Sequence, residues 1–241
     1  MFGLNSYGGE WKNDIEIGRN KKFYIEYFQP LTSSQKFYFK SAFIYNDRKE
    51  YIPAKAAGIP LPGNFDVDMQ RYGGKTGFGT YIFDDFELEF GVAAHDDTVE
   101  VELVGAKENY DARQIYSTIR IDSLDNLNFP NTGFAAKAKW IKEVEGLGSD
   151  YDFKQVYFNI EKPITFGNHN ITTYLKYGET YNKDGQSSLI EGFTLGGLFN
   201  LSGFAPYALN DDNMFLGVMK YRYQIRDGGF WNLECTSLCR L

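Results

Sequence analysis

Hydrophobic and polar residues alternate one by one along many short segments of this chain. The clearest segment is residues 86–94, where apolar side chains occupy the even positions and Glu87, Glu89 and Gly91 lie between them. A period of two is typical of a β-strand whose two faces meet different surroundings. The same pattern recurs at residues 22–27, 36–45, 134–140, 155–161, 171–177 and 215–225. The alternation therefore predicts an all-β chain.

The alternation reverses its phase after Ala94, because the next apolar residues, beginning with Val99, fall on odd positions. A turn or a β-bulge at His95-Asp96-Asp97 would explain such a reversal. We favour one long strand with a bulge, since the face of a strand that carries the apolar residues can change where the surroundings of the strand change, as at the edge of a lipid bilayer.

The connections between the alternating segments differ in length. Tight turns are expected at 20–21 and 84–85, other turns at 32–35, 122–133, 162–170 and 226–229, and longer connections at 47–64, 106–112, 145–152 and 179–212. Outer-membrane barrels join their strands by short periplasmic turns and longer extracellular loops. If Asp84-Asp85 is periplasmic, the two longest connections lie on the extracellular side. We therefore expect one domain, residues 1–241, that forms an antiparallel transmembrane β-barrel of about ten or eleven strands.

Composition agrees with a barrel. The mean hydropathy of -0.42 would suit a soluble protein, but a membrane barrel needs apolar residues on alternate positions only. The chain is 17% aromatic, with 21 Phe and 18 Tyr, and aromatic residues favour strands. No run of about 18 consecutive apolar residues occurs, so no transmembrane helix is expected.

Charge and candidate chemistry indicate no catalytic site. The net charge of -7 argues against a nucleic-acid partner, which would require a basic surface. His95 and His169 are the only histidines, and neither is paired with a serine in a hydrolase pattern. We therefore expect both to be polar residues at turns or a bulge, and the chain to have no enzymatic activity.

Other candidate sites also have simpler explanations. The aspartate pairs at 84–85, 96–97 and 211–212 lack the spacing of a calcium loop, and Cys235 and Cys239 are too few for a metal site. Residues 72–79, Tyr-Gly-Gly-Lys-Thr-Gly-Phe-Gly, lack the Walker spacing. Glycines in a strand mark bends or close contacts instead. We expect no metal and no cofactor.

Two stretches match a known pattern. Residues 192–204 contain Gly196 and Gly197, followed by Leu201-Ser202-Gly203-Phe204. Residues 122–133 read Asp-x-x-Asp-Asn-x-x-Phe-Pro-x-x-Gly, with the defined positions Asp122, Asp125, Asn126, Phe129, Pro130 and Gly133. In such a turn, Asp and Asn side chains bond the backbone, proline ends the strand ladder and glycine permits a positive φ.

Both stretches resemble the bacterial surface antigen family, the barrel of outer-membrane assembly factors and two-partner secretion transporters. The resemblance implies that residues 181–212 form a loop directed into the barrel lumen, with the glycine pair and the Leu-Ser-Gly-Phe motif on it. Ser202 stands where the assembly factors carry an arginine. The Asp-rich stretch is similar to a periplasmic turn of the same family.

The resemblance implies a location in the bacterial outer membrane and a role as membrane anchor or translocation conduit. The implied partners are outer-membrane lipid and the outer-membrane assembly machinery. A second copy of the chain, as a homodimer that completes the barrel, is left open by the sequence. The stretch is most similar to the C-terminal barrel of patatin-like phospholipases, although the Gly-x-Ser-x-Gly motif of a lipase domain is absent here. Because the last residues, 235–241, lack a strand ending in an aromatic residue, we expect an incomplete barrel.

Two alternatives remain open from the sequence. A soluble all-β binding module, such as a sandwich, also has alternating strands, and so does a small porin-like channel. These classes differ in what contacts the apolar faces of the strands. In a sandwich the apolar faces pack against each other, whereas in a membrane barrel they contact lipid.

Overall fold

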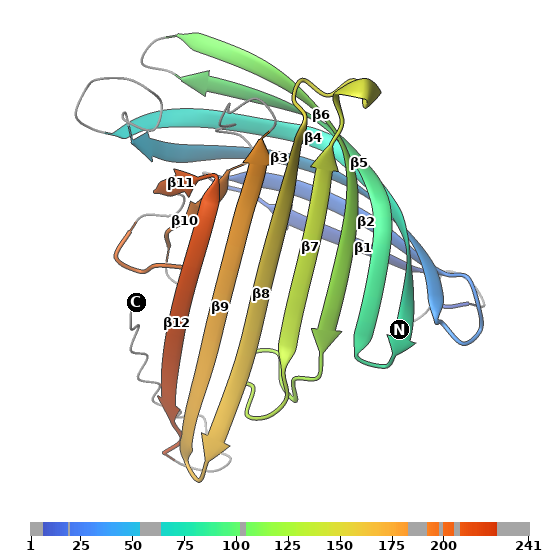
Figure 1. Ribbon diagram of the computed structural model, residues 1–241, viewed down its shortest axis with the longest axis vertical. Helices are drawn as coiled ribbons and strands as arrows, with labels where there is room; N and C mark the ends of the chain where they lie inside the picture. The colour runs from blue at the N-terminus through green and yellow to red at the C-terminus, as the bar shows by residue number, and fades with distance from the viewer. Residues whose placement is uncertain are drawn as a thin grey trace.

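The computed structural model describes residues 7–18, 20–53, 64–101, 105–182, 192–197, 200–204 and 208–225. Ten strands form one curved antiparallel sheet, in the order β1-β2-β3-β4-β5-β6-β7-β8-β9-β12 (Figure 1). Their bounds are β1 Glu10–Glu16, β2 Lys21–Pro30, β3 Phe37–Pro53, β4 Asn64–Phe83, β5 Phe86–Val101, β6 Ala106–Asp122, β7 Ala135–Glu143, β8 Phe153–Phe166, β9 His169–Asn182 and β12 Asn213–Tyr223. Within these residues β1 and β12 are the two edges, so the sheet is open.

A short hairpin accompanies the large sheet. β10 (Phe193–Leu195) pairs with β11 (Leu209–Asp211), and both belong to the connection between β9 and β12. A single 3-10 turn, η1 (Glu145–Leu147), lies between β7 and β8. The expected all-β antiparallel fold is therefore confirmed, and over the described residues its main sheet has ten strands and does not close.

The two faces of the sheet differ sharply. The outer face exposes large apolar side chains, among them Phe23, Phe43, Phe78, Phe90, Val92, Ile115, Ile119, Trp140, Phe158, Leu175, Phe215 and Met219. The concave face instead buries polar side chains such as Glu87, Glu89 and Gln155. No second sheet covers the apolar face within the described residues. The sandwich alternative is therefore wrong, because its apolar faces would be buried against each other.

The change of phase after Ala94 has a different cause from the one expected. β5 pairs with β4 and β6 without a register shift between Ala94 and Thr98, so one long strand is confirmed and the bulge is wrong. His95, Asp97 and Val99 face the concave side, as Glu87 does. The odd positions of β5 therefore keep the concave face along the whole strand, and only the environment of each face changes beyond Ala94.

Beyond Ala94 the concave side contains a small apolar cluster of Val67, Met69 and Val99, with Val101 packed against it. The outer positions there are the polar residues Asp96, Thr98 and Glu100. Polar side chains are unfavourable in contact with the hydrocarbon core of a membrane, so this part of β5 projects beyond the apolar band.

Several expected connections are strand in the structure. β3 continues to Pro53 and β4 begins at Asn64, which shortens the expected connection 47–64. β6 begins at Ala106, so the expected connection 106–112 is wrong. β8 and β9 meet at a two-residue turn, Gly167-Asn168, in place of the expected 162–170 turn. In these places strand pairing extends past the apolar band, where the alternation of apolar and polar residues no longer predicts it.

The antiparallel order gives the sheet two distinct ends. The connections after β1, β3, β5, β7 and β9 lie at one end, which we call the loop end. The connections 31–36, 84–85, 123–134 and 167–168 lie at the other, which we call the turn end. The connections 54–63 and 183–212 therefore lie at the opposite end from Asp84-Asp85, as the sequence predicts, but the connection 123–134 at the turn end is longer than 54–63.

Candidate functional site

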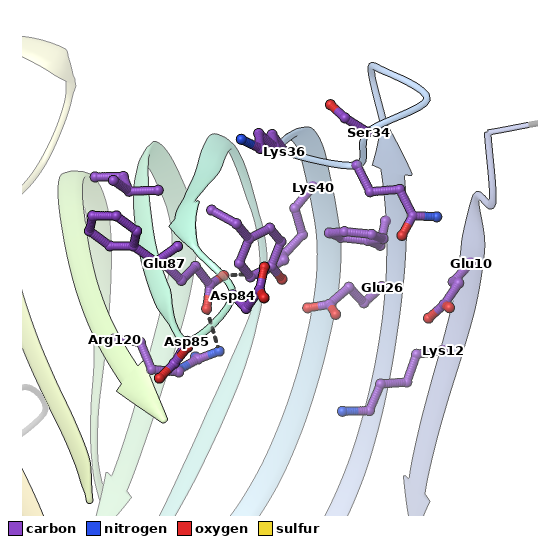
Figure 2. Close-up of a pocket in the computed structure, with 15 residues that line it drawn as sticks. Glu10, Lys12, Glu26, Ser34, Lys36, Lys40, Asp84, Asp85, Glu87 and Arg120 are labelled. Carbon is purple, nitrogen blue, oxygen red and sulfur yellow. Dashed lines mark hydrogen bonds and ion pairs between the residues drawn. The ribbon is translucent and has the colours of Figure 1, made fainter. Parts of the chain in front are cut away.

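The concave wall contains a buried network of tyrosines and charged residues. It depends on β4, where Gly77 and Gly79 leave the inner face without side chains. Tyr38 and Lys40 of β3 can therefore reach across β4 to Glu87 and Glu89 of β5. Figure 2 shows Lys40 and Glu87 of this network, with Glu87 bonded to Arg120. The ring of Tyr38 lies where a Cβ on Gly79 would be, only 2.1 Å from its Cζ. The glycine-rich stretch thus marks close contacts, as the sequence predicts.

Each carboxylate of the network accepts several hydrogen bonds. Glu89 accepts from Tyr38 Oη at 3.2 Å, Lys40 Nζ at 2.7 Å and Tyr116 Oη at 2.8 Å. Glu87 accepts from Tyr38 Oη, and from Arg120 Nη1 at 2.7 Å. Both glutamates are only 6% exposed. Buried carboxylates are tolerated when they are paired and hydrogen-bonded, so this network gives the wall a fixed, polar inner surface.

A cavity of about 850 Å³ lies against this network at the turn end (Figure 2). Its wall combines acidic groups, such as Glu26 and Asp85, with basic groups, such as Lys36 and Arg120. Strands β1 to β6 surround it, together with the turns at 34–36 and 83–85. A large space lined by charges of both signs is typical of a water-filled barrel interior.

His95 and His169 lie in strands. His95 is 7% exposed inside β5, and its Nε2 lies 3.6 Å from Asp97 Oδ2. Asp97 in turn accepts a bidentate pair of hydrogen bonds from Arg71, at 2.7 and 2.8 Å. His169 begins β9, and its Nδ1 lies 2.7 Å from Tyr221 Oη. The expected placement of His95 at a turn or bulge is therefore wrong, because β5 continues through it.

The loop motif lies between β10 and β11. Gly196 and Gly197 have φ values of 133° and 91°, a region that favours glycine. Gly197 N–H donates to the Phe204 carbonyl at 3.0 Å, which brings the glycine pair close to the end of the motif. Leu201 forms a β-bridge with Gly197 and has a φ of 147°. Ser202, Gly203 and Phe204 are exposed, and a Cβ at Gly203 would meet no atom within 4 Å.

Phe193 of β10 is a contact residue that the sequence analysis missed. Its ring packs over Gly178 of β9, where a Cβ would lie 2.5 Å from the ring, and it stacks on Tyr157 of β8 with centroids 6.3 Å apart. Lys176 of the same inner face bonds Asn200 of the loop. The glycine in an otherwise regular strand, Gly178, was the available signal. These contacts hold the described part of the loop against the inner wall.

The hairpin also reaches the opposite wall. β10 lies beside β12 and β11 lies beside β3, and these two strands stand near opposite edges of the sheet. Figure 1 shows the hairpin at the loop end, next to β9 and β12. It therefore lies between the two walls there.

The Asp-rich turn joins β6 to β7 and is organised by its own side chains. Asp125 Oδ1 accepts from the backbone N–H groups of Asn131 and Thr132, at 2.8 and 3.1 Å. Asn126 Oδ1 accepts from Asn128 and Phe129 N–H, at 2.9 and 3.0 Å. The backbone hydrogen bonds, from Thr132 first and then Asn131, lower the pKa of Asp125 below its ordinary value.

The remaining motif positions support the same turn. Asp122 Oδ1 accepts from Leu124 N–H at 3.3 Å. Gly133 has a φ of 99°, and a Cβ there would lie 2.1 Å from the Ser123 carbonyl oxygen. Pro130 is buried, whereas Phe129 is 44% exposed.

The described residues contain no group of three or more His, Cys, Asp or Glu side chains arranged to hold a metal ion. They also contain no helix with the length and apolar character needed to cross a membrane.

An outward apolar face, a charged interior and antiparallel pairing of strands that follow one another in the sequence define the class of transmembrane antiparallel β-barrel walls. The sequence matches the Omp85 superfamily domain over residues 17–232. The chain therefore belongs to the Omp85 superfamily, which is the bacterial surface antigen family of the sequence analysis, and its place is the bacterial outer membrane.

The fold is similar to a solved structure, the crystal structure of BamA from Haemophilus ducreyi lacking POTRA domains 1-3. The TM-score is 0.74 and the sequence identity 14%, over 92% of this chain and 49% of that chain. This chain thus spans about half of that structure. A search of curated protein sequences finds no match.

Proposed function

We propose that this chain is the wall of an outer-membrane β-barrel that serves as a membrane anchor and a translocation conduit. The observation that carries the proposal is the contrast between its faces: aromatic and aliphatic side chains outward, and the Tyr38, Glu87 and Glu89 network inward. An interior of fixed charges around a cavity suits the passage of a hydrated or extended polypeptide better than that of an apolar ligand.

The loop 181–212 is proposed to fold into the lumen and to restrict it. The packing of Phe193 over Gly178 supports this, as does the position of β11 beside β3. The glycine pair Gly196 and Gly197 is proposed to shape the loop through its positive φ angles. Leu201, Ser202, Gly203 and Phe204 would then present the loop's tip to the interior. Because Ser202 replaces an arginine, the loop here is held by other contacts, such as Lys176 with Asn200.

The proposed partners follow from the same surfaces. The outward apolar face fits outer-membrane lipid, and the assembly machinery would insert such a barrel. The edge strands β1 and β12 offer backbone hydrogen-bonding groups to another strand, and a second copy of the chain in a homodimer is one source of it. The proposal includes no nucleic acid, no cofactor and no covalent chemistry by these residues. A patatin-like lipase domain joined to this barrel is proposed from the sequence resemblance alone.

Conductance through a planar lipid bilayer tests the conduit. We expect the protein to insert and to conduct, and Phe193→Ala to raise the open fraction or the conductance, because the loop loses its packing on Gly178 and Tyr157. The matched control is Leu147→Ala, an exposed apolar residue of η1 at the same end, 57% exposed, which should leave the current unchanged. If the protein and both variants insert but carry no current, the conduit role is refuted and the anchor role remains. If they do not insert, the anchor role and the conduit role are both refuted.

A further inference from the structure

The turn between β6 and β7 makes contacts far beyond the two strands that it joins. We call residues 123–134 the β6–β7 strap. β6 and β12 are separated in the sheet by β7, β8 and β9, so at about 4.8 Å per strand the two lie about 19 Å apart. An ordinary hairpin turn would contact its own strands only. This one crosses the turn end and reaches the edge strand β12.

The first contacts of the strap are with the β8–β9 hairpin. Lys162 Nζ donates to the Gly133 carbonyl at 2.9 Å, and Thr165 Oγ1 donates to the Asn131 carbonyl at 2.8 Å. Asn170 Nδ2 donates to the Pro130 carbonyl at 3.1 Å. Asn170 is 4% exposed and is itself held by Thr172 Oγ1, which donates to its Oδ1 at 2.9 Å. Side chains of β8 and β9 therefore hold the strap through its backbone carbonyl groups.

The last contacts are with β12. Arg222 Nη2 donates to Asn131 Oδ1. The Phe129 ring faces two cations of β12, with Lys220 Nζ 5.8 Å and Arg222 Cζ 5.5 Å from its centroid. A hydrogen bond from a charged donor is stronger than a neutral one, and the cation–π contacts of Phe129 add to it. Asn131 holds β8 through its carbonyl and β12 through its side chain, so it is the central residue of the strap.

The position of β12 gives these contacts a consequence. As an edge strand, β12 has a neighbour, β9, on one side only within the described residues, and an edge strand frays more easily than an interior strand. We propose that the β6–β7 strap is a conformational clasp: through Asn131, Arg222 and Phe129 it ties the turn end of β12 to the β8–β9 hairpin and restrains that edge of the sheet from opening. This inference depends on the contacts alone and does not require the conduit.

Hydrogen exchange of the folded protein in detergent micelles tests the clasp. Asn131→Ala removes the acceptor of Arg222 and leaves the backbone contacts of the strap in place. The backbone N–H groups of β12 near Arg222 that bond to β9 should then exchange roughly ten-fold faster, the effect expected of losing a hydrogen bond to a charged group. N–H groups of β3 to β5 should keep their rates. The matched control is Asn128→Ala, the same change at an exposed position of the same turn.

Arg222→Met provides an independent route if Asn131→Ala fails to fold, because it removes the donor of the same contact and should speed the exchange of the same β12 N–H groups. Where both variants fold, adding Asn131→Ala to Arg222→Met should change the exchange of β12 by less than two-fold, because the shared contact is already gone. Equal exchange rates in Asn131→Ala and Asn128→Ala would overturn the proposal. So would acceleration spread evenly over all strands, since that result would indicate a general loss of stability.

Discussion

Replacing Gly79 by alanine tests how the inner wall is built. The added Cβ would lie 2.1 Å from Tyr38 Cζ and 2.2 Å from its Oη, so the ring must move. Tyr38 is 0% exposed and donates to Glu87 and Glu89. Displacing it costs the bonds to charged acceptors, roughly 1.5 to 3 kcal/mol, together with overpacking of roughly 1 to 3 kcal/mol. We therefore expect the free energy of unfolding to fall by roughly 2.5 to 6 kcal/mol.

The matched control is Gly217→Ala in β12. The nearest atom to its new Cβ is Leu175 Cδ2 at 3.7 Å, an ordinary contact. The loss of chain entropy in the unfolded state should make this variant neutral or more stable by up to about 1 kcal/mol. Urea unfolding in detergent micelles, followed by tryptophan fluorescence and by heat-modifiable gel mobility, measures both variants.

A second background isolates the contact. In a Tyr38→Ala protein the ring is absent, so Gly79→Ala should cost less than about 1 kcal/mol more. An equal cost in both backgrounds would refute the packing argument, as would equal effects of Gly79→Ala and Gly217→Ala.

Three further predictions concern the turn and the outer face. Gly133→Ala should destabilise the protein by about 1 to 3 kcal/mol in urea unfolding, because of its positive φ and the 2.1 Å approach to the Ser123 carbonyl oxygen; no change would contradict the turn geometry. The lowered pKa of Asp125 means that its contribution to stability is full above its unfolded pKa of about 3.9 and is lost as the pH falls through the folded value. Asp125→Asn should therefore flatten the acid limb of a stability–pH curve, and an unchanged limb would count against the backbone hydrogen bonds. Phe90→Lys, at a side chain 58% exposed on the outer face, should cost about 2 to 4 kcal/mol of folding in a bilayer, whereas Glu100→Lys on the same face of β5 should cost little; equal costs would remove the distinction between lipid and water along β5.

The sequence predicts the strands well where the two faces meet lipid and a polar interior. Residues 86–94 illustrate this, since each even position is outward and apolar. The prediction fails beyond Ala94 because alternation reports the surroundings of a face, and those surroundings change while the backbone pairing continues. The same reason explains why the strand ends at Pro53, Asn64 and Ala106 could not be placed.

The site is less predictable because its contacts are not local. The glycines of β4 signal a close approach, but nothing in the sequence identifies Tyr38 as the side chain that fills the space over Gly79. Likewise, Gly178 indicates a close contact but does not identify Phe193 as the partner. The turn motif at Asp125 predicts a local turn, but it does not predict that Asn131 of this turn bonds Arg222, 91 residues further along the chain. The register between β3 and β4 places Tyr38 opposite Gly79, and the other two contacts depend on how a loop and a turn fold back onto the sheet.

Nitroxide scanning along β5 in a lipid bilayer tests the central claim most directly. Spin labels would be placed one at a time at positions 86 to 100, and their collisions with lipid-soluble oxygen and with a water-soluble nickel reagent would be compared. The structure predicts that even positions up to Ala94 favour oxygen, that odd positions are shielded or favour nickel, and that Asp96, Thr98 and Glu100 favour nickel although they share the outer face. Preference for nickel at Phe86, Leu88 and Phe90 would contradict a lipid-facing wall.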